Sequence, residues 1–157
     1  MKTMQTWLDE YGESHQNPVN KKIHWICVPL IMLSTIGLFW SIPHGYFPET
    51  GFGFPLNWGI IFIIFAMIIY FRLSVVMFLG MTLIGSLLIF GNHWLLQNLS
   101  LPLWQTSVLI FIPAWIGQFI GHKIEGKKPS FFKDVQFLLI GPAWLLSFIY
   151  QKLGIRY

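Results

Sequence analysis

Hydrophobic side chains fill long stretches of this chain, and ionisable side chains are almost absent from them. Between Ile23 and Gly121 only Glu49 and Arg72 carry a formal charge. Burying a charge in hydrocarbon is unfavourable, so charge-free stretches of about 17–25 residues indicate membrane-spanning helices. The pattern therefore predicts an all-α fold, a polytopic membrane helix bundle.

Turn signals divide the apolar stretches into four to five predicted spans within a single membrane-embedded domain, residues 1–157. The fifth span is shorter than the others and carries Gly141-Pro142 at its middle, so it either crosses the membrane or bends and returns. A Pro/Gly-rich loop at 43–55, a tight turn at 71–74 and a loop at 98–102 separate the earlier spans. The predicted spans are 23–41, 56–70, 75–95, 103–121 and 135–153.

A short helix is expected before the first span, over residues 3–14. Trp7, Leu8 and Tyr11 share one of its faces, which is typical of an interfacial helix with aromatic side chains at headgroup level. Asn17-Pro18 is expected to end this segment, because the residue before proline disfavours the helical conformation. We take residues 1–20 as the interfacial segment and 21–153 as the helix bundle, with Asn20 as the helix N-cap.

Composition agrees with a membrane protein. The chain has 157 residues, of which 55% are hydrophobic and 10% charged, whereas a soluble domain carries about 25% charged residues. The net charge of +4 does not indicate nucleic-acid binding, because the basic residues lie between spans and not on one soluble face. Cys27 is the only cysteine, which excludes an intrachain disulfide and a cysteine-based zinc site.

Basic residues also set the expected orientation. If Lys21 and Lys22 face the cytoplasm, alternation of the spans places Arg72 and the segment 123–133 on the same side, as the positive-inside rule requires. Only Lys152 and Arg156 break the pattern, and only if the last span crosses fully.

This orientation sorts the five histidines into two groups. His15, His24 and His122 fall at the cytoplasmic edge, whereas His44 and His93 fall at the opposite edge, about 30 Å away across the hydrocarbon core. Only the first three are therefore expected to meet.

A metal site is one reading of this edge. Gln118, His122 and Glu125 lie on one helix face at i, i+4 and i+7. Three imidazoles and a carboxylate suit a divalent metal, and iron, manganese and zinc accept overlapping ligands. The other reading is structural: interfacial histidines contact headgroups or cap helices, and Glu125 forms a solvated ion pair with neighbouring lysines.

Two segments resemble a known family. They are His15-x-Asn-Pro-x-Asn-x-x-Ile-His24-x-x-x-x-Pro29 and Trp115-Ile-x-Gln118-Phe-Ile-Gly-His122-x-x-Glu125-x-x-x-Pro129. Together they resemble the 2-hydroxy fatty acid dioxygenases of the yeast endoplasmic reticulum type, long catalogued as a domain of unknown function and widespread in bacteria. The resemblance continues weakly through Asp134 and Gly141-Pro142, and the middle spans match only in hydrophobicity.

The resemblance implies an Fe(2+)-dependent membrane dioxygenase that uses O2 to shorten a 2-hydroxy fatty acid by one carbon. His15, His24 and His122 match the family's metal ligands, and Glu125 matches its acidic position, so that His122 and Glu125 are expected to be catalytic. The expected substrate-binding residues are Asn20, Gln118, Lys123, Lys127 and Lys128, with the lysines as point charges for the carboxylate. The expected location is the bacterial inner membrane, or the endoplasmic reticulum membrane in a eukaryote.

Two other function classes compete with the enzyme. A small membrane scaffold or lipid-binding protein would use the polar segments only for helix capping and headgroup contacts. A metal or solute transporter is disfavoured, because transporters place polar groups near the midplane and the spans here carry no charge in their interiors.

The topology can be tested by cysteine labelling in a Cys27→Ser background. Gly51→Cys should react with an impermeant thiol reagent added to intact cells, and Lys128→Cys should not, because the two positions are expected on opposite sides of the membrane. Equal labelling of both would remove the argument that three histidines share one edge.

Overall fold

The computed structural model describes residues 2–43, 45–126 and 137–157. In these ranges the chain forms helices and no strand, apart from one isolated bridge between Glu49 and Pro55. Three helices, α2, α4 and α5, are long and apolar enough to cross a membrane. The predicted all-α membrane bundle is confirmed, with the helices α1 (Met4–Gly12), α2 (Pro18–Trp40), α3 (Trp58–Leu73), α4 (Val75–Asn98), α5 (Leu103–Glu125) and α7 (Ile140–Leu153).

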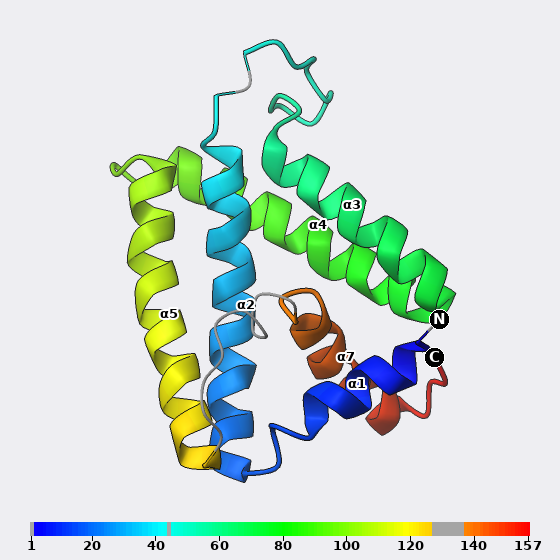
Figure 1. Cartoon of the computed structure of the whole chain (residues 1–157). Helices are drawn as coiled ribbons and strands as arrows, with labels where there is room; N and C mark the ends of the chain where they lie inside the picture. The colour runs from blue at the N-terminus through cyan, green and yellow to red at the C-terminus, as the bar shows by residue number, and fades with distance from the viewer. Residues whose placement is uncertain (1, 44, 127–136) are drawn as a thin grey trace.

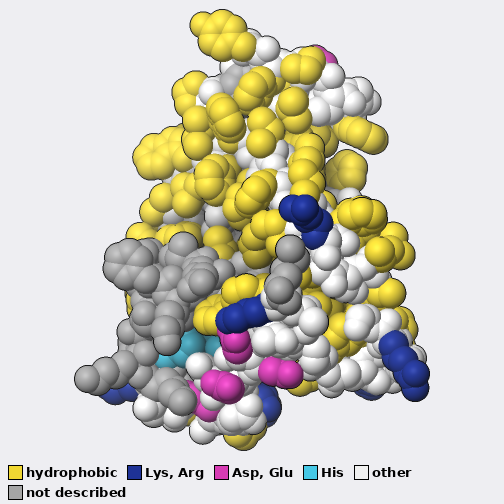
Figure 2. Space-filling view, turned by 45° about the vertical axis from the view of Figure 1, so that its right-hand side comes forward, with side chains coloured by type: hydrophobic (Ala, Val, Ile, Leu, Met, Phe, Trp, Pro, Cys, Tyr) yellow, Lys and Arg dark blue, Asp and Glu magenta, His cyan; other side chains and the backbone are white. Residues whose placement is uncertain are grey.

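The helices form an upright pair, a tilted hairpin and a short pair. Figure 1 shows α2 and α5 side by side and antiparallel, with the α3–α4 hairpin inclined against α2. Helices α1 and α7 lie together below α4, and the two chain termini are close to each other. We call the end that holds the start of α2 and the end of α5 the lower end, as it is drawn in Figure 1. Charged side chains gather there, whereas hydrophobic side chains cover the upper part (Figure 2).

Glycines allow α2 and α5 to approach closely. A Cβ added at Gly117 would lie 2.6 Å from Cys27 Sγ, and one added at Gly37 would overlap the hydroxyl of Ser107. Small residues at a helix interface are typical of membrane bundles, where packing replaces the hydrophobic effect as the force between helices. This close packing determines which residues at the start of α2 lie opposite the end of α5.

The start of α2 differs from the prediction. The helix begins at Pro18, and its N-cap is Asn17, whose side chain accepts from the backbone N–H of Val19 at 2.9 Å. The prediction that Asn20 is the cap was wrong, because proline fits the first helical position, where its missing N–H has no partner to lose. Asn20 is therefore inside the first turn, where its side chain is fully buried.

The last helix also differs from the prediction. Helix α7 has 14 residues, about 21 Å at 1.5 Å per residue, which is too short for a hydrocarbon core of about 30 Å. Gly141 and Pro142 lie in its first turn and not at its middle, because proline is tolerated at a helix start. Part of the predicted span, residues 135 and 136, lies outside the described residues.

Two tyrosine hydroxyls hold α7 at the lower end. Tyr150 donates to the carbonyl of Val76 at 2.9 Å, and Tyr70 donates to the carbonyl of Leu139. Both ends of α7 are thereby attached to the α3–α4 hairpin, and the C-terminus returns beside the N-terminus (Figure 1). If α7 does not cross the membrane, Lys152 and Arg156 lie on the same side as the other basic residues. The expected charge distribution then has no exception. Helix α3 itself runs on to Leu73, so the predicted turn at 71–74 reduces to Ser74.

Helix α1 packs its apolar face against α7. Leu8 and Tyr11, which the sequence placed on one face, are both buried. The ring of Tyr11 lies 5.3 Å from that of Trp144 in α7, between centroids. The first helix therefore contributes aromatic side chains to the protein interior.

The close α2–α5 contact is testable at Gly117. Gly117→Ala should lower the free energy of unfolding by about 1–3 kcal/mol, because the added methyl group meets Cys27 Sγ. The measurement is the thermal unfolding midpoint in detergent. Cys27→Ala combined with Gly117→Ala should recover most of the loss, whereas Gly45→Ala, with no neighbour within 4 Å of the added atom, should have no effect. An unchanged midpoint for Gly117→Ala alone would contradict this packing.

Candidate metal centre

Three histidines from three segments meet at the lower end of the bundle. His15 lies in the connection between α1 and α2, His24 lies in the second turn of α2, and His122 lies in the last turn of α5. One ring nitrogen from each lies within 4.8 Å of the others. Their side chains are 2%, 0% and 5% exposed, respectively. The structure therefore brings together the three histidines that the sequence placed at one membrane edge.

Hydrogen bonds to the backbone fix the tautomers of two of these rings. His15 Nδ1 lies 2.5 Å from the carbonyl oxygen of Tyr11, and His24 Nδ1 lies 3.0 Å from that of Asn20. A carbonyl oxygen only accepts, so each Nδ1 carries the proton and each Nε2 carries a lone pair. Such carbonyl contacts orient the histidine ligands of many metal sites.

The two Nε2 atoms face each other at 2.9 Å. With both Nδ1 atoms protonated, two lone pairs point at one space, which is repulsive unless a cation lies between or beside them. Two nitrogen ligands about 2.1 Å from one ion and at a right angle to each other are ~3.0 Å apart. The spacing and the donor set therefore fit a divalent metal ion, with His122 as the third nitrogen donor.

The surroundings keep His15 neutral. Burial lowers the pKa of His15 to about 4, so its imidazole carries no charge near pH 7. Tyr11 stacks on it with ring centroids 4.1 Å apart, and the Trp144 ring lies 5.2 Å away. A neutral imidazole is the form that binds a metal, and the aromatic rings exclude water from it.

Glu125 binds backbone and amide N–H groups at the start of α2. Its two carboxylate oxygens accept from the backbone N–H groups of Gln16 and Asn17, both at 2.8 Å, and from the Asn20 side-chain amide at 3.0 Å. A carboxylate at a helix N-terminus also interacts favourably with the helix dipole. Glu125 thus fastens the α1–α2 connection onto α5, and it is not among the groups whose donor atoms cluster in the described part of the chain.

Asn20 joins the same network. Its amide also donates to the carbonyl of Ser14 at 3.2 Å. Its side-chain oxygen lies where a Cβ of Gly121 would be, so that the residue before His122 has to be glycine for the helices to meet. The two amide hydrogens of Asn20 are therefore both used to hold the connection that carries His15.

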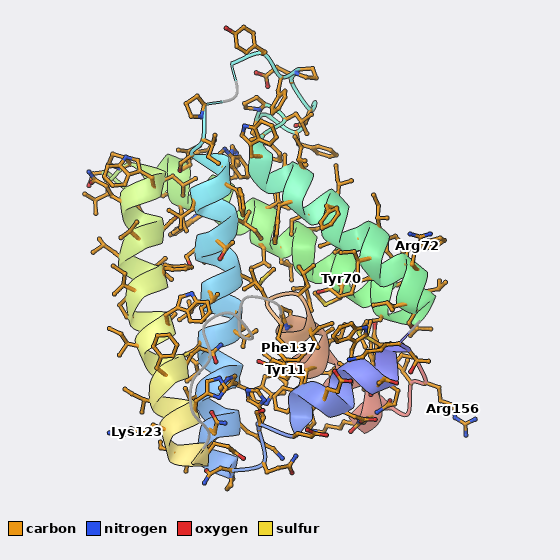
Figure 3. All side chains as sticks on the ribbon, viewed as in Figure 1. Tyr11, Tyr70, Arg72, Lys123, Phe137 and Arg156 are labelled. Atoms are coloured by element: carbon orange, nitrogen blue, oxygen red, sulfur yellow. The ribbon has the colours of Figure 1, made fainter. Side chains whose placement is uncertain are left out.

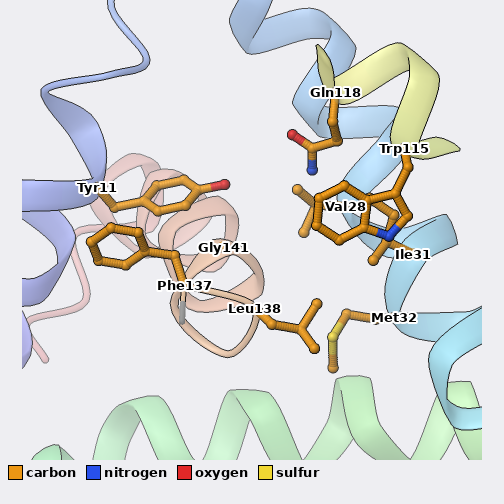
Figure 4. Close-up of a pocket in the computed structure, with 9 residues that line it drawn as sticks. All are labelled: Tyr11, Val28, Ile31, Met32, Trp115, Gln118, Phe137, Leu138 and Gly141. Carbon is orange, nitrogen blue, oxygen red and sulfur yellow. The ribbon is translucent and has the colours of Figure 1, made fainter. Parts of the chain in front are cut away.

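Gln118 lies one helical turn before His122 and lines a cavity together with Tyr11, whose ring stacks on His15. The cavity has a volume of about 20 Å³, which is room for about one water molecule. Figure 4 shows the Gln118 amide and the Tyr11 hydroxyl pointing into it from opposite sides, above the apolar side chains of Val28, Met32 and Leu138. The cavity thus has a polar edge, formed by one residue a helical turn from His122 and one that stacks on His15, and an apolar edge.

The remaining predicted site residues are placed differently. Lys123 is exposed and points away from the bundle on the outer side of α5 (Figure 3), so it does not face the histidines. Lys127 and Lys128 lie outside the described residues, as do His44, Pro129 and Asp134. His93, in α4, stacks on Trp40 with ring centroids 6.4 Å apart, at the upper end of the bundle. It is not part of the histidine cluster.

Sequence reasoning missed Tyr11 and Trp144 as site residues. Tyr11 was assigned only to an amphipathic face, yet its carbonyl accepts from His15 and its ring stacks on His15. Trp144 touches His15 only because α7 returns beside α1. A usable signal was the short distance in sequence between Tyr11 and His15, which is one turn of backbone.

Comparison with known proteins now adds the family. Residues 1–153 match the family described as "Mpo1-like: 2-hydroxy-palmitic acid dioxygenase Mpo1-like". The chain belongs to the Mpo1-like family. It is also similar to the protein named "2-hydroxy-palmitic acid dioxygenase MPO1" of Saccharomyces cerevisiae, with 26% identity over 153 residues that cover 96% of this chain and 82% of the relative. No solved structure matches the chain. The Mpo1-like match includes all three clustered histidines and Glu125.

The role of Glu125 can be separated from metal binding. Glu125→Ala should lower the free energy of unfolding by about 1.5–3 kcal/mol, because three N–H donors lose a charged acceptor. The measurement is thermal unfolding in detergent, with a metal supplied and with a chelator present. The decrease should persist with the chelator present, because the three hydrogen bonds do not need a metal, whereas a decrease seen only with metal would mean that Glu125 is a ligand. Glu10→Gln, which removes an exposed ion pair with Lys2, should have little effect.

Proposed function

We propose that this protein is an Fe(2+)-dependent dioxygenase that shortens 2-hydroxy fatty acids by one carbon. The observation that carries the proposal is the buried histidine cluster in a chain of the Mpo1-like family. The named activity of the yeast relative supplies the substrate class. We further propose that the protein works in a membrane with its site at the cytoplasmic edge, in the bacterial inner membrane or in the endoplasmic reticulum of a eukaryote.

His15, His24 and His122 would hold the metal through ring nitrogens. When bound, iron(II) would supply the redox chemistry that activates O2. In the net reaction, the bond between C1 and C2 breaks, C1 leaves as CO2, C2 becomes the carboxyl carbon of the shorter acid, and one water forms. The substrate loses four electrons and O2 takes them up, so no further reductant is needed.

The carbonyl oxygens of Tyr11 and Asn20 keep both Nδ1 atoms protonated, so the Nε2 atoms stay available. Glu125 keeps His15 in place through the backbone of Gln16 and Asn17. Tyr11 and Trp144 cover His15 and exclude bulk water, which strengthens polar interactions in the site. These contacts assemble the site before the substrate enters.

The polar side chains that line the cavity, Gln118 and Tyr11, would orient the substrate. The Gln118 amide can donate to the substrate carboxylate, and the Tyr11 hydroxyl can hydrogen-bond to the 2-hydroxyl group (Figure 4). The cavity is smaller than a carboxylate group, so binding requires lining side chains such as Leu138 to move. The alkyl chain would remain among the helices.

A non-catalytic scaffold gives no account of this cluster. Burying three imidazoles is unfavourable, and neither helix capping nor headgroup contact requires three buried ring nitrogens within 4.8 Å of one another. A bound cation would offset this unfavourable burial, which favours a metal site.

Metal content is the first test. Protein purified anaerobically in detergent and supplied with iron should hold close to one iron per chain, and His122→Ala should lose most of it. His93→Ala is the matched control, because His93 lies at the other end of the bundle, and it should keep its iron. Iron-loaded wild type should then convert 2-hydroxyhexadecanoic acid to the acid one carbon shorter, with consumption of one O2. Absence of metal in the wild type after iron has been offered would refute the proposal.

A further inference from the structure

An apolar groove runs along the middle of the bundle between α2, α4 and α7. Its volume is about 180 Å³, larger than an engineered cavity of about 150 Å³ that binds benzene. Its walls are apolar side chains of all three helices, including two prolines, which have no N–H to offer. The lining residues are Trp25, Val28, Pro29, Met32, Ile84, Leu88, Pro142, Leu145, Leu146 and Ile149.

The groove adjoins the cavity beside the histidines. Val28 and Met32 line both spaces, and Figure 4 shows both side chains at the cavity. They follow His24 one and two helical turns along α2, on the same face. A single face of α2 therefore leads from a metal-binding nitrogen into the groove.

The groove opens at one side and has a buried floor. Trp25 and Ile149 are 42% and 43% exposed, so the described part of the chain leaves both partly open. The floor side chains Val28, Met32 and Leu145 are all buried. An alkyl chain in the bilayer can therefore enter sideways between Trp25 and Ile149.

The far end of the groove is closed by α4. The Asn92 amide donates to the carbonyls of Leu33 and Leu88, each at 3.0 Å, which brings this part of α4 against α2. Leu33 is nine residues beyond His24, about 13 Å along the helix. At Gly91 an added Cβ would meet Leu33 Cδ1 at 3.3 Å. The space for an alkyl chain thus ends near Leu88.

We propose that this groove binds the alkyl chain of the substrate and that Leu88 limits its length. The inference rests on the proposed function, because that function supplies a ligand with a polar head at the histidines. The groove then receives the rest of the same molecule. Burial of methylene groups stabilises the complex by about 0.8 kcal/mol each, so affinity rises with chain length until the chain reaches Leu88.

The first test fills the far end. Leu88→Trp should lower the ratio of kcat/KM for 2-hydroxyhexadecanoic acid to that for 2-hydroxyoctanoic acid by about tenfold or more. Leu87→Trp is the matched control, because its side chain is the next along α4 and is 64% exposed. It should leave the ratio unchanged. Equal ratios in both variants and the wild type would overturn the proposal.

The second test needs no catalysis. A 2-hydroxy fatty acid with a diazirine at the end of its chain is photolysed with metal-free protein in phosphatidylcholine nanodiscs, and the labelled residues are mapped by mass spectrometry. Labels should fall on groove residues of α4 and α7, and excess 2-hydroxyhexadecanoic acid should compete them away. The labels on groove residues should be absent in Leu88→Trp and present in Leu87→Trp.

The outcomes separate the groove from the enzyme. Competed labelling without turnover of iron-loaded wild type would support the groove and refute the dioxygenase proposal. Groove labelling that excess 2-hydroxyhexadecanoic acid does not reduce would show that a bilayer lipid occupies the groove. Labelling only outside the groove would show that the alkyl chain does not bind in the groove. Either of these two results would overturn the groove proposal.

Discussion

The hydrogen bonds of one carboxylate hold this site together. Glu125, at the end of α5, accepts from the backbone of Gln16 and Asn17 and from the Asn20 amide. These bonds tie the α1–α2 connection to α5 and set the position of His15 against His122. The glycine at 121 is part of the same constraint, because a larger residue would overlap the Asn20 side chain. Close packing and a charge-assisted network therefore act at the same place.

The charge balance of the site favours an anionic ligand. A divalent ion held by three neutral imidazoles would keep its full charge, and an uncompensated charge is unfavourable in a buried setting. Glu125 is already engaged with three N–H donors. A substrate that carries a carboxylate would bring the opposite charge directly to such an ion, so that its binding and metal binding would support each other. A neutral lipid offers no such compensation.

The sequence predicted the parts of this site that follow from patterns along the chain. The scarcity of charge located the long helices, and their alternation placed His15, His24 and His122 at one end. What it did not predict depends on contacts between distant segments: the three bonds of Glu125, the return of α7 beside α1, and the stacking of Tyr11 on His15. Asn20 shows the difference well. Its position before an apolar run favoured a role as helix N-cap. The helix instead begins at Pro18 with Asn17 as its cap, and the Asn20 amide donates to Glu125.

One face of helix α2 changes from polar to apolar side chains along its length. Asn20 and His24 occupy its first turns, Val28 and Met32 follow, and the face ends where Leu33 meets Gly91. A molecule bound along this face has to be polar at one end and apolar at the other, and it has to stop before the upper end of the bundle. A transporter needs a path that continues to the other side, whereas contact between α2 and α4 closes this one. The order of residues on α2 therefore matches an amphiphile that binds, reacts at its polar end and leaves by the side through which it entered.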